Sequence, residues 1–191
     1  YGMKQYVGTL KLAIVILGVR EVRNIVLGIS VFTSLSNERT KALFAKGFWE
    51  HSLKVGALTK LLATEFNLNL QGEDFIAGLL HDIGKMVLWR QLGQQYADIF
   101  QEGEGCGAAL RKLEQERLGF DHADAATVLA SKWNLPDTLA HAMFCHHRRA
   151  DRDLRQAKDP RLASAVRIAN LASRDDFSGD SPASAKACRD E

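Results

Sequence analysis

Apolar residues recur along this chain at the spacing of helix turns, and almost no segment alternates apolar and polar residues as a half-buried strand does. Only three prolines occur in 191 residues, so long helices are permitted. No internal repeat is evident. The pattern therefore predicts an all-α protein in which several amphipathic helices share one core.

The first apolar stretch, residues 10–35, predicts two helices that are broken near Gly18. The second of these helices carries its apolar side chains on one face: Val22, Ile25, Val26 and Ile29. Charged and amide residues interrupt the stretch near its middle: Arg20, Glu21, Arg23 and Asn24. A membrane-spanning helix needs about 20 predominantly apolar residues, so we expect no membrane segment here.

Two further helices are predicted over residues 49–66 and 74–89. In the first, His51 lies four residues before Val55, so its imidazole shares the face that points to the core. In the second, His81 and Asp82 lie within a continuous apolar pattern. Because a buried carboxylate without a partner is costly, Asp82 requires hydrogen-bond donors or a cation.

The second half of the chain predicts three more helices after a glycine-rich loop at 103–107 and a charged helix at 108–118. Asp121 is expected to cap a helix that runs to about Trp133, and residues 134–136 end that helix and start the next one. The next helix carries Leu139, Met143, His146 and His147 on one side. Asp159 and Pro160 begin the last helix.

We expect one domain over residues 1–174, with its N-terminal part incomplete at Tyr1. The segment 175–191 is rich in Ser, Asp, Ala and Lys and has no apolar period. It is predicted to be a polar, poorly packed tail.

Residues that can bind a metal occur on the core face, or in the first turn, of four predicted helices: His51, the His81–Asp82 pair, His122 and the His146–His147 pair. Imidazole and carboxylate ligands together favour iron, manganese, zinc or nickel over calcium or magnesium. Such ions polarise phosphoryl oxygens and activate water, which is the chemistry of hydrolytic sites. Taken singly, each histidine is better explained as a hydrogen-bonded core residue. Their joint occurrence on four helices is what points to a metal site.

Composition narrows the class of protein. Lys and Arg number 25 against 23 Asp and Glu, and no long basic run is present, so a nucleic-acid partner is not implied. The hydrophobic fraction of 46% is enough for a sizeable core. Cys106, Cys145 and Cys188 form no CxxC pair and are odd in number, so we expect free thiols and a cytoplasmic location.

These residues lead to a family resemblance. The order of His51 and then His81–Asp82 within FIAGLLHDIGK resembles the HD superfamily of metal-dependent phosphohydrolases. The text GFDHADAATVLASKWNLPDTLAHAMFCHH, residues 119–147, resembles the HDOD family, the HD-related output domains of bacterial signalling proteins. LKLAIVILGVREVRNIVLGISV, residues 10–31, is similar to that family's middle segment. The resemblance covers roughly residues 1–173.

The resemblance implies an HD-domain-like helical bundle and a role downstream of, or beside, signalling modules. HD relatives bind one or two metal ions through the positions of His51, His81 and Asp82 and through an Asp on a late helix. In this chain the late position is Asn170, in RIANLA. An amide oxygen is neutral and binds metal more weakly than a carboxylate, so this departure weakens the site and its catalytic competence.

Three further histidines match positions that multinuclear HD enzymes use for additional ions: His122, His146 and His147. They can compensate with nitrogen ligands, so the resemblance implies one or two transition-metal ions. Residues 148–151 read Arg-Arg-Ala-Asp and lack the GYP signature of HD-type cyclic-dinucleotide phosphodiesterases, which disfavours that activity.

Two other residues have a possible role by resemblance. Lys85 matches a residue that contacts substrate phosphate in HD relatives, which makes Asp82 and Lys85 the candidate catalytic pair. The alternative for Lys85 is a solvated lysine at a helix end that neutralises the last carbonyls. Glu114 lies where the family often carries an acidic residue before the Asp-His pair, as a ligand or general base, although we favour a charge on the helix surface.

Three functions stay open. The favoured one is a regulatory domain with a metal site that acts through a signalling protein partner or a nucleotide-like ligand. The alternative is an active phosphohydrolase or phosphodiesterase on a nucleotide-like substrate. In a third, weaker interpretation, the histidines serve as structural hydrogen-bonding groups in a scaffold that binds a partner.

Overall fold

A computed structural model describes residues 9–38, 40–41, 47–70, 72–105, 107–147 and 155–174. All regular elements within these ranges are helices and none is a strand, which confirms the predicted all-α class. None of the helices in the described part of the chain has the length and apolar character to cross a membrane. The predicted tail at 175–191 and the Arg-Arg-Ala-Asp segment lie outside the described residues, as do Cys106 and Cys188.

Helices α1 (Leu10–Leu17) and α2 (Val19–Leu35) are separated at Gly18, as predicted. Gly18 has a φ of 84°, in the left-handed region that glycine adopts without strain. The predicted apolar face of α2 is not the face that packs, because Val26 and Ile29 are 55% and 61% exposed. The packed face consists instead of Asn24, Gly28, Val31, Phe32 and Leu35.

Gly28 lies on the packed face of α2, beside the Leu79 side chain. A Cβ placed on Gly28 would lie 3.0 Å from the Leu79 side chain, so this glycine lets the helix come close to the core. Two apolar side chains of α2 that follow the predicted pattern, Val26 and Ile29, are exposed to solvent. They form, with α1, an exposed apolar surface that we call the α1–α2 apolar surface: Val15, Ile16, Val19, Val26 and Ile29.

Helix α4 (Phe48–Glu65) packs closely against α5 (Asp74–Leu80) and α12 (Pro160–Arg174). Two glycines meet where α4 and α5 cross, since a Cβ on Gly78 would lie 2.8 Å from the Cα of Gly56 and 2.7 Å from the carbonyl oxygen of Val55. A larger residue at either position would force the helices apart. Glycine therefore sets the distance between His51 on α4 and His81 at the end of α5.

The segment 74–89 was predicted as one helix, and this prediction is wrong. Helix α5 ends at Leu80, α6 (Ile83–Leu92) begins three residues later, and His81 and Asp82 form the turn between them. Consecutive residues of a continuous helix point about 100° apart. Because the chain leaves the helical path at Asp82, with φ −98° and ψ 9°, the two adjacent side chains can face the same centre.

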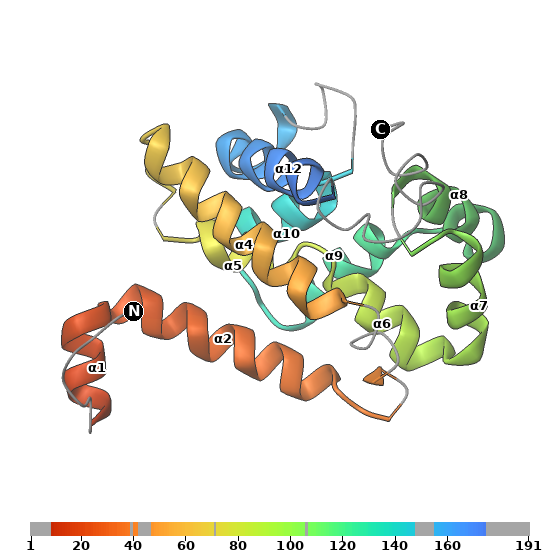
Figure 1. Ribbon diagram of the computed structural model, residues 1–191, viewed down its shortest axis with the longest axis horizontal. Coiled ribbons are helices and arrows are strands. Elements are labelled where there is room, and N and C mark those ends of the chain that lie inside the picture. The colour runs from red at the N-terminus through yellow and green to blue at the C-terminus, as the bar shows by residue number, and fades with distance from the viewer. Residues whose placement is uncertain are drawn as a thin grey trace.

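Helices α7 (Gln94–Glu102) and α8 (Gly107–Leu118) follow, and α7 has no counterpart among the predicted elements. Asp121 caps α9 (His122–Lys132), as predicted, and Asp124 completes a capping box with it. Helix α10 (Asp137–Cys145) ends just before His146. Figure 1 shows α7 and α8 at the end of the molecule opposite α1, with α4, α5, α9, α10 and α12 between them.

Helices α6 and α9 approach each other more closely than any side chain would allow. A Cβ on Gly84 would lie 1.8 Å from the carbonyl oxygen of His122 and 2.9 Å from the amide nitrogen of Ala126. This contact brings the first turn of α6 onto the first turn of α9. It thereby sets Asp82 beside His122.

Candidate metal centre

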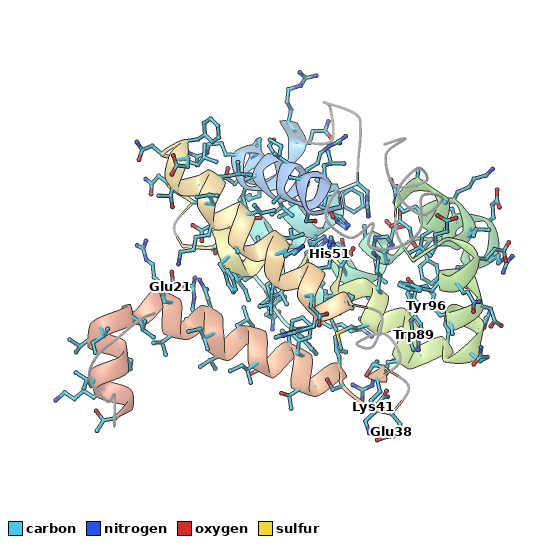
Figure 2. All side chains as sticks on the ribbon, in the orientation of Figure 1. Glu21, Glu38, Lys41, His51, Trp89 and Tyr96 are labelled. Carbon is cyan, nitrogen blue, oxygen red and sulfur yellow. The ribbon has the colours of Figure 1, made fainter. Side chains whose placement is uncertain are left out.

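Asp82 lies at the centre of a buried cluster of histidines. Its side chain is 2% exposed, and each carboxylate oxygen faces a different group of imidazoles. The structure brings together Asp82 and five of the six histidines: His51, His81, His122, His146 and His147. Figure 2 shows His51 on the side of α4 that faces α9 and α10. The sixth, His141, lies apart and accepts a hydrogen bond from the amide of Lys158 at 2.8 Å.

The cluster divides into two parts that share Asp82. The two-histidine lobe consists of His51, His81 and Asp82. In it, Asp82 Oδ2 lies 3.3 Å from His81 Nε2 and 3.7 Å from His51 Nε2, and the two Nε2 atoms are 3.2 Å apart.

The three-histidine lobe consists of Asp82, His122, His146 and His147, all buried. Asp82 Oδ1 lies 3.4 Å from His122 Nε2 and 3.2 Å from His146 Nε2. One ligand atom from each of the four residues lies within 4.8 Å of the others. A carboxylate that serves both lobes has the geometry to bridge two ions.

The same local device orients His81 and His146. Each residue follows the last turn of a helix, α5 or α10, and each ring presents Nδ1 to the carbonyl three residues earlier, Gly78 O at 2.7 Å and Met143 O. A carbonyl oxygen only accepts, so Nδ1 must carry the proton. The neutral ring then turns the lone pair of Nε2 toward Asp82, which is the tautomer that a metal ligand needs.

His122 is oriented by a carboxylate. Glu114 Oε2 accepts from its ring Nδ1 at 2.7 Å and from its backbone amide at 3.0 Å, while Glu114 Oε1 accepts from the hydroxyl of Tyr96 at 2.6 Å. Glu114 is fully buried, so our interpretation of it as a surface charge is wrong. It touches the far side of His122, and its carboxylate therefore acts on the ligand rather than on the centre itself.

His51 is oriented from α12. Ser173 Oγ lies 3.3 Å from His51 Nδ1 and donates its own proton to the carbonyl oxygen of Asn170 at 2.8 Å. With its proton used there, the hydroxyl oxygen is left to accept from His51. Asn170 is buried, its backbone carbonyl accepts from Ser173, and its side-chain Oδ1 has no hydrogen-bond partner among the described residues.

The charge states of Asp82 and His146 match a cation site. Burial by itself raises the pKa of Asp82, but His81, Lys85 and the two histidines at Oδ1 hold it well below the usual value, so the carboxylate is ionised. Burial, helped by His81 and His122, lowers the pKa of His146 to about 3 despite Asp82, and its imidazole is neutral. An ionised carboxylate and a neutral imidazole are the forms that bind metal. Burial lowers the pKa of His122, but Glu114 and Asp82 raise it to about 9, so His122 must release a proton to bind a metal.

Lys85 is in direct contact with Asp82. Its Nζ donates to Asp82 Oδ2 at 2.7 Å and lies 3.4 Å from the carbonyl oxygen of Gly105. Lys85 is 5% exposed and lies in the first turn of α6. The interpretation of Lys85 as a solvated lysine at the C-terminal end of a helix is therefore wrong.

The residues fit a metal ion. Asp82 Oδ1, His122 Nε2 and His146 Nε2 are all buried, and within the described ranges none of the three has a hydrogen-bond partner. Native proteins rarely leave three such atoms facing one another, because each unmet group costs about 1–3 kcal/mol. A cation at this point would satisfy all three at once. The nitrogen-rich donor set suits a divalent transition ion.

Sequence reasoning missed several residues that build the site. Tyr96, Ser173 and Arg111 carry no motif, and their roles depend on contacts between helices. Arg111 binds Asp121 Oδ2 through Nε at 3.1 Å and Nη2 at 3.0 Å, and donates from Nη1 to the carbonyl oxygen of His147 at 3.0 Å. It thereby ties the end of α10 to the start of α9.

The HDOD domain family matches residues 1–149 of this chain. The match includes all five histidines of the cluster and Asp82, and it ends before α12, which carries Asn170 and Ser173. No curated protein shows significant similarity to the sequence.

Solved structures share the fold. A putative phosphohydrolase from Shewanella amazonensis is 24% identical with a TM-score of 0.71, and the match covers 88% of this chain and 60% of that one. An HDOD domain protein of unknown function from Geobacter sulfurreducens is 19% identical with a TM-score of 0.69, over 90% of this chain and 56% of that one.

A third structure, the MmoQ response regulator from Methylococcus capsulatus, is 25% identical with a TM-score of 0.61, and the match covers 98% of this chain and 74% of that one. The chain thus spans less than two thirds of the length of the first two structures.

Proposed function

Because the chain belongs to the HDOD family, we propose that it is a bacterial regulatory domain of a signalling system, that it holds a transition-metal ion, and that its output is made through protein or ligand binding. The metal site rests on one observation: Asp82 Oδ1 faces His122 Nε2 and His146 Nε2, and none of these three atoms has a hydrogen-bond partner in the described part of the chain. Iron, manganese, zinc and nickel are the ions that this donor set favours.

Three features favour regulation over turnover. The late helix offers the neutral amide of Asn170 where HD enzymes have a carboxylate, and Lys85 already neutralises part of the charge on Asp82. Every residue of the three-histidine lobe is buried, which would restrict the approach of a substrate to an ion bound there. One relative with the same fold is a response regulator by its printed description, which supports a signalling role.

The α1–α2 apolar surface supports an output through contact with protein. Its side chains are between 46% and 73% exposed, and apolar surface left exposed on a folded domain can serve as an interaction site. Signalling protein partners are therefore favoured over nucleic acid or membrane. The cytoplasmic location expected from cysteine usage stays a prediction.

The second candidate is an active phosphohydrolase or phosphodiesterase on a nucleotide-like substrate. When bound, a divalent ion supplies Lewis acidity toward a phosphoryl oxygen or a water molecule. In this alternative His51, His81, Asp82 and His122 or His146 hold the ion, and Lys85 binds the phosphate. The intact histidine set supports it, as does the description of one relative as a putative phosphohydrolase.

Elemental analysis of the purified chain tests the metal site. We expect a transition metal in the wild type and its loss in Asp82→Asn, because this carboxylate is shared by both lobes. Asp98→Asn changes an exposed carboxylate on α7 and serves as the control, with metal retained. A wild-type protein that contains no metal and gains none on incubation with zinc or manganese would contradict the proposal.

Turnover separates the two candidates. Metal-loaded wild-type protein is expected to leave common nucleotides and a phosphodiester such as bis(p-nitrophenyl) phosphate unchanged. Hydrolysis that depends on added metal and disappears in Asp82→Asn would instead establish the enzyme.

A further inference from the structure

Asp82 uses its two carboxylate oxygens in different ways. Oδ2 accepts a hydrogen bond from Lys85 Nζ at 2.7 Å, so the ammonium lies directly on the ligand atom of the two-histidine lobe. Oδ1 has no hydrogen-bond partner among the described residues. One side of the carboxylate is therefore satisfied by a cation of the protein itself, and the other is not.

The ligand atoms of the two lobes differ in the same way. In the two-histidine lobe, His51 Nε2 and His81 Nε2 lie 3.2 Å apart, and the carboxylate oxygen beside them, Asp82 Oδ2, already accepts from the ammonium of Lys85. In the three-histidine lobe, His122 Nε2 and His146 Nε2 face Oδ1 at 3.4 and 3.2 Å without hydrogen-bond geometry. Lys85 thus serves the carboxylate oxygen of the first lobe, whereas among the described residues no donor serves Asp82 Oδ1 in the second.

The charge and the exposure of the two lobes also favour the three-histidine lobe as the site of a divalent ion. The two-histidine lobe has one carboxylate oxygen and a buried ammonium beside it, so a divalent ion there meets a like charge at short range. The three-histidine lobe adds three imidazoles and lies on the side of the carboxylate away from that hydrogen bond. His51 has an 18% exposed side chain, whereas all four members of the three-histidine lobe are buried.

We propose that Lys85 is the resident counter-ion of the two-histidine lobe, so that the domain binds a single ion, in the three-histidine lobe. This assignment rests on the metal site proposed above and specifies which half of it is used. Lys85 then limits the domain to one bound ion. His51 and His81, which match ligands common to HD enzymes, do not hold that ion in this chain.

Titration with Co²⁺, whose visible absorption reports its ligands, tests the assignment on the full chain. The wild type is expected to bind one Co²⁺ per chain. His146→Ala is expected to weaken binding at least tenfold, and His51→Ala by less than about threefold. Unfolding curves without metal show whether each variant is folded.

The Lys85→Gln variant tests the role of the ammonium. It is expected to bind a second Co²⁺ or to bind at least tenfold more tightly, and this gain should vanish in the double variant Lys85→Gln/His51→Ala. Lys112→Gln removes the same charge from an exposed position on α8 and should match the wild type. If Lys85→Gln does not fold, the contrast between His51→Ala and His146→Ala still tests the assignment.

Three results would overturn the assignment. These are loss of Co²⁺ in His51→Ala with retention in His146→Ala, two ions in the wild type, or a Lys85→Gln protein with unchanged stoichiometry and affinity. Absence of Co²⁺ binding in every variant is a different result, which contradicts the metal site itself and the lobe assignment with it.

Discussion

Glu114 holds His122 at two points, because one carboxylate oxygen accepts from both the ring Nδ1 and the backbone amide of that residue. Burial raises the pKa of Glu114, but the attraction of His122 and the hydrogen bonds from His122 and Tyr96 lower it below its usual value. An ionised, buried carboxylate behind a histidine fixes the ring and makes its other nitrogen a better ligand.

Glu114→Gln should therefore weaken metal binding by about 10- to 100-fold while leaving the fold intact, since the amide oxygen can still accept from the ring. Zn²⁺ affinity measured by competition with a chelator checks this. Glu116→Gln, on the exposed face of the same helix, is the control and should bind as the wild type does. Equal affinities for the two variants would show that Glu114 does not act on His122 as a ligand.

The contact between Gly84 and His122 predicts a severe effect of a single methyl group. Gly84→Ala places a Cβ against backbone atoms that cannot move aside, so α6 and α9 must separate. We expect a loss of more than about 3 kcal/mol in the free energy of unfolding, or failure to fold.

Gly28→Ala is the matched control, because there the new methyl meets only the ends of the Leu79 and Ile76 side chains. Alanine also favours the helix by about 1 kcal/mol over glycine, so the change should be close to neutral. Urea denaturation of both variants measures the difference. A Gly84→Ala protein as stable as Gly28→Ala would be incompatible with the observed packing of α6 on α9.

Metal removal should lower thermal stability if the site binds as proposed. An ion at about 100 times its dissociation constant stabilises the native state by about 2.7 kcal/mol. For a domain of this size that corresponds to roughly 5–10 °C in Tm. Thermal unfolding with added Zn²⁺ and with a chelator checks this, and an unchanged Tm would favour the scaffold in which the histidines are structural.

Asp121 predicts a dependence of stability on pH. Burial raises its pKa, but the Asp124 amide, His122 and Arg111 outweigh this and lower the pKa to about 2. A lowered pKa means that the carboxylate stabilises the folded state fully above about pH 4, its unfolded range, and loses this effect as the pH falls toward 2.

Asp121→Asn keeps a good N-cap and removes the charge that Arg111 binds. At pH 7 we expect a loss of about 1–2 kcal/mol in the free energy of unfolding, shrinking as the pH falls from 4 toward 2. Urea midpoints of the two proteins at several pH values measure it. A difference that stays constant down to the lowest pH would mean that the charge contributes nothing.

Local signals made part of this structure predictable. Asp121 precedes an apolar helix and has Asp124 three residues later, so the capping box depends only on residues 121–124. Gly18 breaks the first apolar stretch for an equally local reason. His51 was placed on the core face from its spacing to Val55, and in the structure Val55 is buried and the His51 side chain is 18% exposed.

Other features depend on contacts that no short segment encodes. The pattern around His81 and Asp82 is apolar without a Pro, and the turn there depends on the packing of α5 on α4 and of α6 on α9. Glu114 sits in a helix rich in charges, and only the position of α8 beside Tyr96 and His122 buries it. The apolar stripe predicted on α2 is not the face that packs, because the face with Gly28, Val31 and Phe32 meets the core instead.

The His51–Ser173 contact joins residues 122 positions apart. Closing loops of this length costs chain entropy before any contact forms, so such a cluster assembles near the end of folding. Before the cluster has assembled, the only ligands close to one another are neighbours in the sequence, such as His146 and His147, and they bind an ion weakly. A bound ion therefore slows unfolding far more than it speeds folding. In a cell, metal supply would set how long the folded domain survives proteolysis, and not whether it forms.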